Sequence, residues 1–244
     1  SLGQSAWSEP RAVAESALVW RTFTDPSGRL HLLYVRPTHT NGAPAGVYYA
    51  SLAAGAVDWS ARQALYPSIY ARLLLAEQVH LTGAADGEEH VVAAWNDPRL
   101  ERTFMANSAD GGVTWERPSD VTVPDVTLPQ LVAVGNGAFL ALWQGARAGY
   151  GTALYEQHSS DGGRTWDTPR RVLDDLSAST QEVALRYAGQ GNALLVVGAG
   201  SPGLTLAAWD ASQKTRPDIM GWSELHRLEM SFRDAETGRT VWLG

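Results

Sequence analysis

The chain has 244 residues and a formal net charge of −7; 44% of its residues are hydrophobic and 18% are charged. This length suits one large all-β or α/β domain, and the hydrophobic content excludes an intrinsically disordered chain. The acidic charge argues against a nucleic-acid partner, and no apolar run is long enough for membrane insertion. The absence of cysteine excludes disulfides and thiolate metal sites.

Short apolar segments recur along the chain, and each follows a turn that contains glycine. These segments are Leu30–Arg36, His90–Trp95, Ala138–Trp143, Ala193–Gly198 and Arg239–Leu243. A second set of strand-like segments comprises Val47–Ser51, Thr103–Ser108, Thr152–Ser159 and Leu204–Trp209. No stretch shows sustained helical periodicity with helix caps. The sequence therefore predicts an all-β fold.

Tryptophan marks an internal repeat. Trp7, Trp59, Trp115, Trp166 and Trp222 lie 52, 56, 51 and 56 residues apart. A period of about 50 residues is typical of β-propellers and solenoids, in which each repeat is one supersecondary unit. The pattern divides the chain into repeats at approximately 17–66, 73–123, 128–173 and 181–230.

Two of these tryptophans end a longer motif. Its residues are Ser108, Asp110, Gly112, Thr114 and Trp115 in one copy, and Ser159, Asp161, Gly163, Thr165 and Trp166 in the other. The Asp-Gly-Gly centre supplies the positive φ angles and the side-chain acceptor of a tight hairpin turn. Such a turn accounts for every fixed residue, so the motif predicts structure rather than chemistry. Calcium binding is not expected, because the EF-hand spacing and its terminal Glu are absent.

The pattern S-x-D-x-G-x-T-W is identified as the Asp-box, or BNR repeat, and the chain resembles the sialidase-like β-propellers that carry it. Two copies are intact, whereas the copy at Ser51–Trp59 lacks the Asp and the copy before Trp222 is more degenerate. The resemblance implies a β-propeller of four-stranded antiparallel blades, with Asp-box turns between the third and fourth strands. In that family the boxes lie at the blade periphery, away from the active face.

The number of blades stays open in the sequence. We expect residues 1–16 and 231–244 to contribute to a closing blade, with an outer strand at Trp7–Val13 and inner strands in Ser231–Leu243. Pairing the two termini would remove the exposed edges of an open sheet. The result is a single propeller domain of about five blades. The alternative is part of a six-bladed ring, the number that the resemblance implies.

A binding site is expected on the loop-rich face, which is the face opposite the Asp-box turns. The candidate ligand-binding residues on it are Arg36, Tyr70, Arg72, Arg99, Arg147 and Tyr150. Further polar residues there are His39, Tyr66, Asn96, Arg102, Gln144, Asp174 and Asp175. Guanidinium groups suit carboxylate ligands. The alternative is that arginine is only the default surface cation, since Lys214 is the single lysine among 19 lysine and arginine residues.

The catalytic pattern that the resemblance implies is incomplete. Sialidases carry an aromatic-Arg-Ile-Pro segment whose Arg begins a carboxylate-binding triad; here Trp20–Phe23 holds Arg21 but lacks Ile-Pro. Glu182 begins a segment that resembles the one with the family's Glu, yet Gly198–Gly200 stands where the second Arg is expected. No segment matches the third Arg and the nucleophilic Tyr. Arg21, Asp97 and Glu182 are the candidates for a divergent site.

Three functions follow as hypotheses. The leading one is a secreted or cell-surface binding module without catalysis, which recognises a glycan or a protein partner through the loop-rich face. The second is a sialidase-like exo-glycoside hydrolase with a divergent active site, and the third is a structural subunit of a larger assembly. No cofactor and no metal are expected, because the histidines are scattered and the common metal, nucleophile and phosphate motifs are absent.

Overall fold

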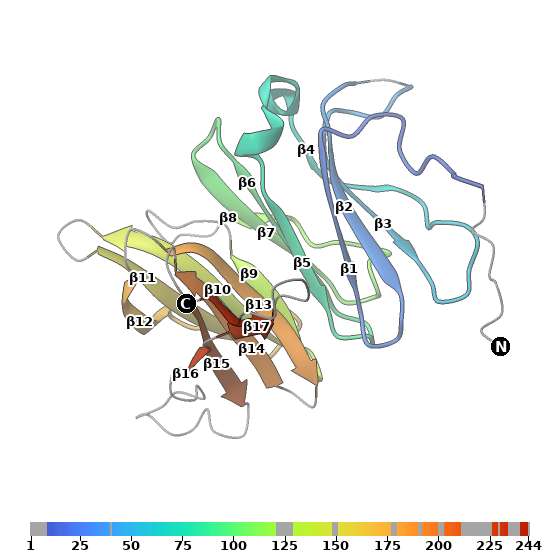
Figure 1. Cartoon of the computed structure of the whole chain (residues 1–244). Coiled ribbons are helices and arrows are strands. Elements are labelled where there is room, and N and C mark those ends of the chain that lie inside the picture. Colours follow the sequence, from blue (N-terminus) through green and yellow to red (C-terminus); the bar gives the residue numbers. More distant parts are fainter. Residues whose placement is uncertain are drawn as a thin grey trace.

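The computed structural model describes the backbone of residues 9–39, 41–120, 129–147, 151–176, 180–189, 192–199, 203–210, 226–228, 230–233 and 240–243. Within these ranges the regular structure consists of β-strands and two short 3₁₀ helices (Figure 1). Predictions for Trp7, Tyr150 and Trp222, and for the side chains of Gln144, Arg147, Asp174, Asp175 and Glu182, lie outside the described residues. Among the described residues, no helix has the length and apolar character needed to cross a membrane.

Four antiparallel sheets of four strands follow one another along the chain, and we call them blades 1 to 4. Blade 1 contains β1 (Val19–Thr24), β2 (Leu30–Arg36), β3 (Gly46–Leu52) and β4 (Gln63–Pro67). Blade 2 contains β5 (Leu81–Ala85), β6 (Val91–Asp97), β7 (Arg102–Ser108) and β8 (Ser119–Asp120). The helices η1 (Ile69–Leu73) and η2 (Ala76–Gln78) lie in the crossover between these two blades.

The later blades repeat the plan. Blade 3 contains β9 (Gln130–Gly135), β10 (Ala138–Arg147), β11 (Gly151–Ser159) and β12 (Arg170–Leu176). Blade 4 contains β13 (Thr180–Gly189), β14 (Asn192–Ala199), β15 (Gly203–Asp210) and β16 (His226–Leu228). A further two-stranded sheet consists of β17 (Met230–Arg233) and β18 (Thr240–Leu243), and it overlaps the segment Ser231–Leu243, where inner strands of a closing blade were predicted.

The first strands of successive blades lie next to one another. β1 contacts β5, β5 contacts β9, and β9 contacts β13, so these four strands form the inner side of the arrangement (Figure 1). In every four-stranded sheet the spatial order follows the sequence, which places the fourth strand at the periphery. The predicted all-β propeller of four-stranded antiparallel blades is thereby confirmed.

Face-to-face packing of the sheets forms the core. Leu33 and Tyr49 of blade 1 share one buried cluster with Trp95 of blade 2, and all three are at most 1% exposed. Side chains alternate between the two faces of a strand, so Tyr34 and Tyr48 belong to a different cluster on the opposite side of blade 1. Aromatic side chains of this size bury large areas and fix the spacing of packed sheets.

The N-terminal segment differs from the sequence prediction. Residues 9–13 form no strand, although an outer strand was expected at Trp7–Val13. Instead, Arg11 pairs with Asp58 at 3.1 Å, and Val13 packs against the outward face of blade 1 beside Trp59. These side-chain contacts hold the segment against a face of blade 1, and it does not pair as a strand with an edge of a sheet. Closure of the ring by pairing of the two termini stays a prediction.

The two intact Asp-boxes form the predicted turns between third and fourth strands. The Ser108 hydroxyl donates to Asp110 Oδ1 at 2.8 Å and accepts from the backbone of Gly112 at 2.9 Å. The Thr114 hydroxyl and backbone N–H also donate to Asp110, and these bonds hold the pKa of its carboxyl below the usual value. The Trp115 indole donates to the Gly112 carbonyl at 3.2 Å. The copy from Ser159 to Trp166 makes the corresponding bonds.

The glycines of the intact boxes also make room for the preceding blade. Gly112 has a φ of 89°, and a Cβ on it would overlap the Tyr49 ring of blade 1. In the degenerate turn of blade 1, Gly55 has a similar φ of 74° but faces open space. Both glycines therefore have a left-handed backbone, but only Gly112 of the two is also packed against a side chain of another blade.

This pair of turns gives a direct test. We expect Gly112→Ala to lower the free energy of unfolding by about 3 kcal/mol, because it adds overlap with Tyr49 to the strain of a left-handed residue. Gly55→Ala carries the backbone strain alone and should cost about 1 kcal/mol. Urea denaturation of the two variants measures the difference, and equal losses would contradict the packing role of Gly112.

Candidate functional site

A cavity of about 460 Å³ lies along the inner strands, and we call it the inner-strand cavity. It is lined by residues 21–26 of blade 1, residues 82–85 of blade 2 and residues 130–133 of blade 3. Residues 83–85 of β5 have small side chains. At Gly83 the absence of a side chain makes room for the Phe23 ring, which a Cβ would overlap. The volume of the cavity is within the range of small-ligand sites, roughly 300–1,000 Å³.

Arg21 is the cation among the described residues that line this cavity. It is exposed, and it has no hydrogen-bond or ion-pair partner among the residues that the structure describes. The lining also includes the hydroxyls of Thr22, Thr24 and Thr82 and the amide of Gln130. A guanidinium with free donors beside hydroxyl and amide groups can bind a carboxylate or a sugar hydroxyl.

Asp25 is the carboxylate in the described lining, and its oxygens are already engaged. It accepts from the Ser27 hydroxyl at 2.6 Å, from the Arg29 backbone at 3.0 Å and from the His31 ring at 3.2 Å. Burial opposes ionisation of Asp25, but these hydrogen bonds prevail and hold its pKa below the usual value. Asp25 is therefore an ionised structural group rather than a free acid or base.

The loop-rich face brings together three of the predicted binding residues, Tyr70, Arg72 and Arg99. Tyr70 lies on η1 and is 41% exposed. Arg72 donates to the carbonyl of Ile69 at 3.3 Å, and Arg99 donates to the carbonyl of Leu73 at 3.1 Å. Both guanidinium groups thus stabilise the crossover that contains η1, and each retains further donors.

Other predicted residues of this face have structural contacts. Asn96 clamps the crossover through Gln78 and His80, and Arg102 pairs with Asp120 at 2.9 Å. Asp97 is 3% exposed and accepts two backbone N–H groups of the turn that follows it. Tyr66 packs between the blades against Trp95 and Phe104. Arg36 is 6% exposed and pairs with Glu15, and His39 is exposed on the β2–β3 loop.

The same face carries exposed apolar side chains that the sequence analysis missed. We call them, with Tyr70, the crossover patch: Ile69, Tyr70, Leu73, Leu75 and Leu100. Their exposed fractions lie between 38% and 67%. The apolar run after Ser68, which lacks the alternation of a strand, is the signal that could have identified it. The inner-strand cavity had no such signal, because Gly83 and Gln130 belong to no motif.

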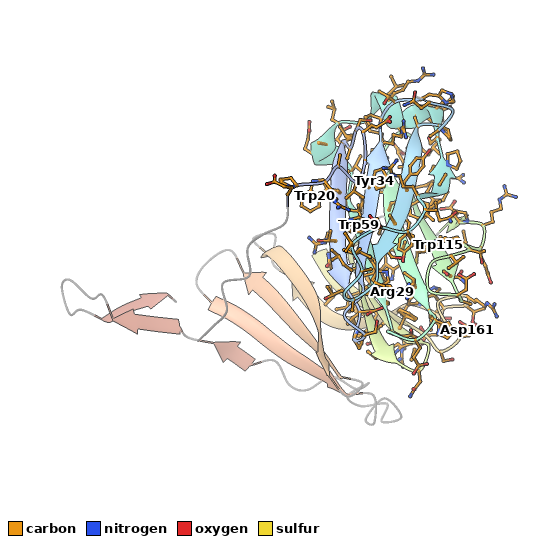
Figure 2. The ribbon with its side chains drawn as sticks, turned by 90° about the vertical axis from the view of Figure 1, so that its right-hand side faces the viewer. Trp20, Arg29, Tyr34, Trp59, Trp115 and Asp161 are labelled. Carbon is orange, nitrogen blue, oxygen red and sulfur yellow. The ribbon has the colours of Figure 1, made fainter. Side chains whose placement is uncertain are left out.

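The Asp-box turns and the exposed Trp20 lie toward opposite ends of the blades. Figure 2 shows Trp20 at the upper end of β1, and Arg29 and Asp161 near the lower end, where the Asp-box turns lie. Trp20 is 64% exposed, directly before Arg21 in the sequence. Among the described residues, no group of three His, Asp or Glu side chains could hold a metal ion.

Comparison with solved structures shows a shared fold at low identity. A Hadza microbial sialidase has 17% identity and a TM-score of 0.52, with 85% of this chain and 46% of that chain covered. An α-L-arabinanase of Penicillium chrysogenum, complexed with arabinobiose, has 15% identity and a TM-score of 0.51, with 91% and 68% covered. A protein of unknown function from Dyadobacter fermentans has 12% identity and a TM-score of 0.53, with 93% and 74% covered.

The chain spans less than half the length of the sialidase that it matches. No curated protein matches the chain. A family model described as a BNR repeat-like domain matches residues 1–236, which is nearly the whole chain. The Asp-box turns, the four-stranded blades and this match agree, and the chain belongs to the BNR repeat-like domain family.

Proposed function

We propose that the chain is a non-catalytic glycan-binding propeller that takes an acidic sugar in the inner-strand cavity. The observation that carries this proposal is the state of Arg21 and Asp25, the two charged groups in the described part of the cavity lining. Arg21 has free donors, whereas Asp25 is held by three hydrogen bonds. A guanidinium binds a sugar carboxylate through two parallel hydrogen bonds, and neighbouring threonine hydroxyls suit the sugar's own hydroxyls.

Hydrolysis is the less supported function of the same cavity. Glycosidases use two carboxyl groups about 5–9.5 Å apart, one of which must exchange a proton with the substrate. In the described lining Asp25 is the one carboxylate, and its three donors stabilise it as an anion. This composition supports binding rather than bond cleavage. A secreted or cell-surface location belongs to the proposal, because acidic glycans are common there.

Binding of acidic sugars by Arg21→Ala is the first test. We expect its affinity for a sialoside or a galacturonide to fall at least tenfold, since a charged hydrogen bond contributes about 1.5–3 kcal/mol. Arg11→Ala is the matched control, because it removes an exposed arginine on the outer side of blade 1. Isothermal titration calorimetry measures both, with the neutral parent sugar as the ligand control. Equal affinity of the two variants would exclude the cavity as the binding site.

Turnover of fluorogenic glycosides by the unaltered chain separates binding from hydrolysis. We expect no release of fluorophore between about pH 4 and pH 8, because the described lining holds no free acid–base pair. Turnover that disappears in Arg21→Ala would instead establish the divergent-hydrolase hypothesis.

A protein partner is the second candidate function, and the crossover patch favours it. The patch is exposed, yet Arg99 and Asn96 fix the backbone on which it stands. Ordered apolar side chains exposed as a group are typical of protein contact surfaces.

The double variant Ile69→Ser, Leu73→Ser tests whether the patch is a free surface. We expect the free energy of unfolding to change by less than about 1 kcal/mol, because both side chains are more than half exposed. Binding of the fluorescent apolar dye ANS should fall at the same time. A large loss of stability would show that the patch belongs to the core instead.

A further inference from the structure

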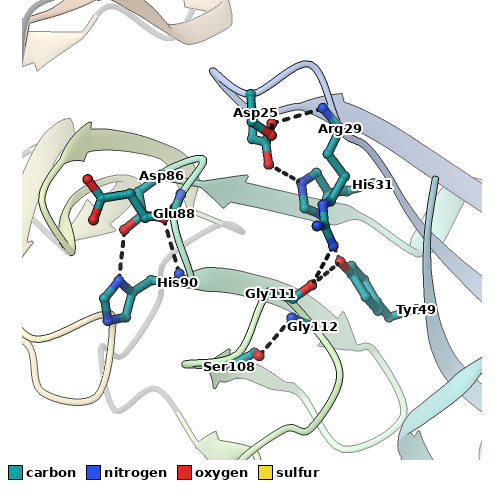
Figure 3. A network of polar contacts seen from close by, with 11 residues as sticks. Asp25, Arg29, His31, Tyr49, Asp86, Glu88, His90, Ser108, Gly111 and Gly112 are labelled. Carbon is teal, nitrogen blue, oxygen red and sulfur yellow. Dashed lines mark hydrogen bonds and ion pairs between the residues drawn. The ribbon is translucent and has the colours of Figure 1, made fainter. Parts of the chain in front are cut away.

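A buried chain of polar groups crosses from blade 1 to the Asp-box turn of blade 2 (Figure 3). It begins at Asp25, whose Oδ2 lies 3.2 Å from Nε2 of His31. Nδ1 of His31 lies 2.8 Å from the hydroxyl of Tyr49, and that hydroxyl lies 3.4 Å from the carbonyl oxygen of Gly111. His31 is 1% exposed and Tyr49 is fully buried.

Blade 2 has a related contact without the tyrosine. His90 Nδ1 lies 2.8 Å from Asp86 Oδ2, and the same oxygen accepts from the backbone of Gly137 at 3.2 Å. The His90 ring occupies the space in which a Cβ on Gly162 would stand. His90, just before β6, therefore lies directly against the Asp-box turn of blade 3, whereas in blade 1 the hydroxyl of Tyr49 lies between His31 and the Asp-box turn of blade 2.

We propose that protonation of His31 redirects the Tyr49 hydroxyl from His31 to the carbonyl of Gly111, so that the joint between blades 1 and 2 is proton-sensitive. When His31 is neutral, only one ring nitrogen carries a hydrogen. The ionised Asp25 can only accept, so that hydrogen lies on Nε2. Nδ1 is then an acceptor, and the Tyr49 hydroxyl donates to it.

Protonation reverses the second of these bonds. Nδ1 gains a hydrogen and donates to the Tyr49 oxygen, so the hydroxyl hydrogen must turn to another acceptor. The Gly111 carbonyl is within reach, and it can accept from Tyr49 as well as from the Arg29 guanidinium, because a carbonyl oxygen has two lone pairs. One covalent bond forms in this step, the Nδ1–H bond of His31, and its proton comes from solvent. The Tyr49 hydroxyl only rotates about its C–O bond.

The groups around His31 set the direction of the pH response. Asp25 and Arg29 face it from its own hairpin turn, Tyr49 faces it from β3, and the Phe23 ring stacks on it at 4.8 Å. Burial lowers the pKa of His31 below its ordinary value of 6.5, and Asp25 offsets this only in part. Burial also raises the pKa of Tyr49 to about 12, so its hydroxyl keeps its hydrogen.

The sign of the linkage follows from these groups. The unfolded chain takes up a proton on His31 at a higher pH than the folded chain does. Stability is therefore lost as the pH falls below 6.5 toward the folded-state pKa. The redirected hydroxyl limits this loss, because it gives the new N–H of His31 an acceptor.

The variant Tyr49→Phe tests the proposal, since it keeps the ring and removes the hydroxyl. In this variant the Nδ1–H of protonated His31 has no acceptor. We expect its unfolding constant, relative to the unaltered chain, to rise about fivefold between about pH 7.5 and pH 5.5, because a charged buried donor costs more than a neutral acceptor. Urea denaturation at each pH gives the unfolding constants.

Tyr48→Phe is the matched control. Tyr48 is the neighbouring residue on the opposite face of β3, and its hydroxyl donates to the carbonyl of Pro44 at 2.6 Å. Its relative unfolding constant should not change with pH. In a His31→Gln background, the pH dependence of the Tyr49→Phe effect should also disappear.

An effect of Tyr49→Phe that stays constant or shrinks at acid pH would overturn the proposal, because a hydroxyl that only donates to neutral His31 loses that bond on protonation anyway. NMR of isotope-labelled histidine is the second measurement, and it does not depend on the His31→Gln variant being folded. We expect the His31 ring of the folded chain to gain a hydrogen on Nδ1 at acid pH while its Nε2 hydrogen persists. A ring that stays neutral until the chain unfolds would equally contradict the switch.

Discussion

The packing of one blade against the next is the constraint on which this structure depends. Each blade has two apolar faces: blade 2 buries one against blade 1 and the other against blade 3, whereas blade 1 covers its second face with Val13 and Trp59. Tyr49 illustrates the consequence at one position: its ring lies against Trp115 and fills the space that Gly112 leaves open. The Asp-box is accordingly more than a turn within its own blade. Its glycines are the surface that receives the preceding blade, and its Ser, Asp and Thr residues hold that surface in shape.

The inner-strand cavity follows from the same arrangement. Strands that meet edge to edge around a centre cannot fill it with small side chains, and β5 contributes Gly83 and alanines there. The site is thus built from three blades, and no single repeat contains it. The crossover patch has a different origin, because it lies on a connection between blades whose backbone is fixed by Asn96 and Arg99. The inner-strand cavity, which contains Arg21, and the apolar crossover patch therefore share no residue.

The sequence predicted the repeated strands well, because short apolar runs and glycine turns are local signals. The segment Leu30–Arg36 agrees with β2 in both bounds. The strand expected at Trp7–Val13 failed over residues 9–13, where contacts of Arg11 and Val13 with a distant part of blade 1 prevail over local pattern. The candidate site was harder to predict. Arg21 was selected from a resemblance, whereas its neighbours in the cavity come from other repeats and are ordinary threonine, glycine and glutamine residues.

Asp25 belongs both to the inner-strand cavity and to the contact between blades 1 and 2. It lines the inner-strand cavity, and it also holds the ring of His31. A negative charge placed in the cavity would add to that of Asp25 and would favour the protonated form of His31. Occupancy of the cavity and proton uptake by the histidine are then coupled equilibria, and such coupling is reciprocal. The affinity for an anionic ligand would rise at acid pH, and the bound ligand would in turn raise the proton affinity of His31.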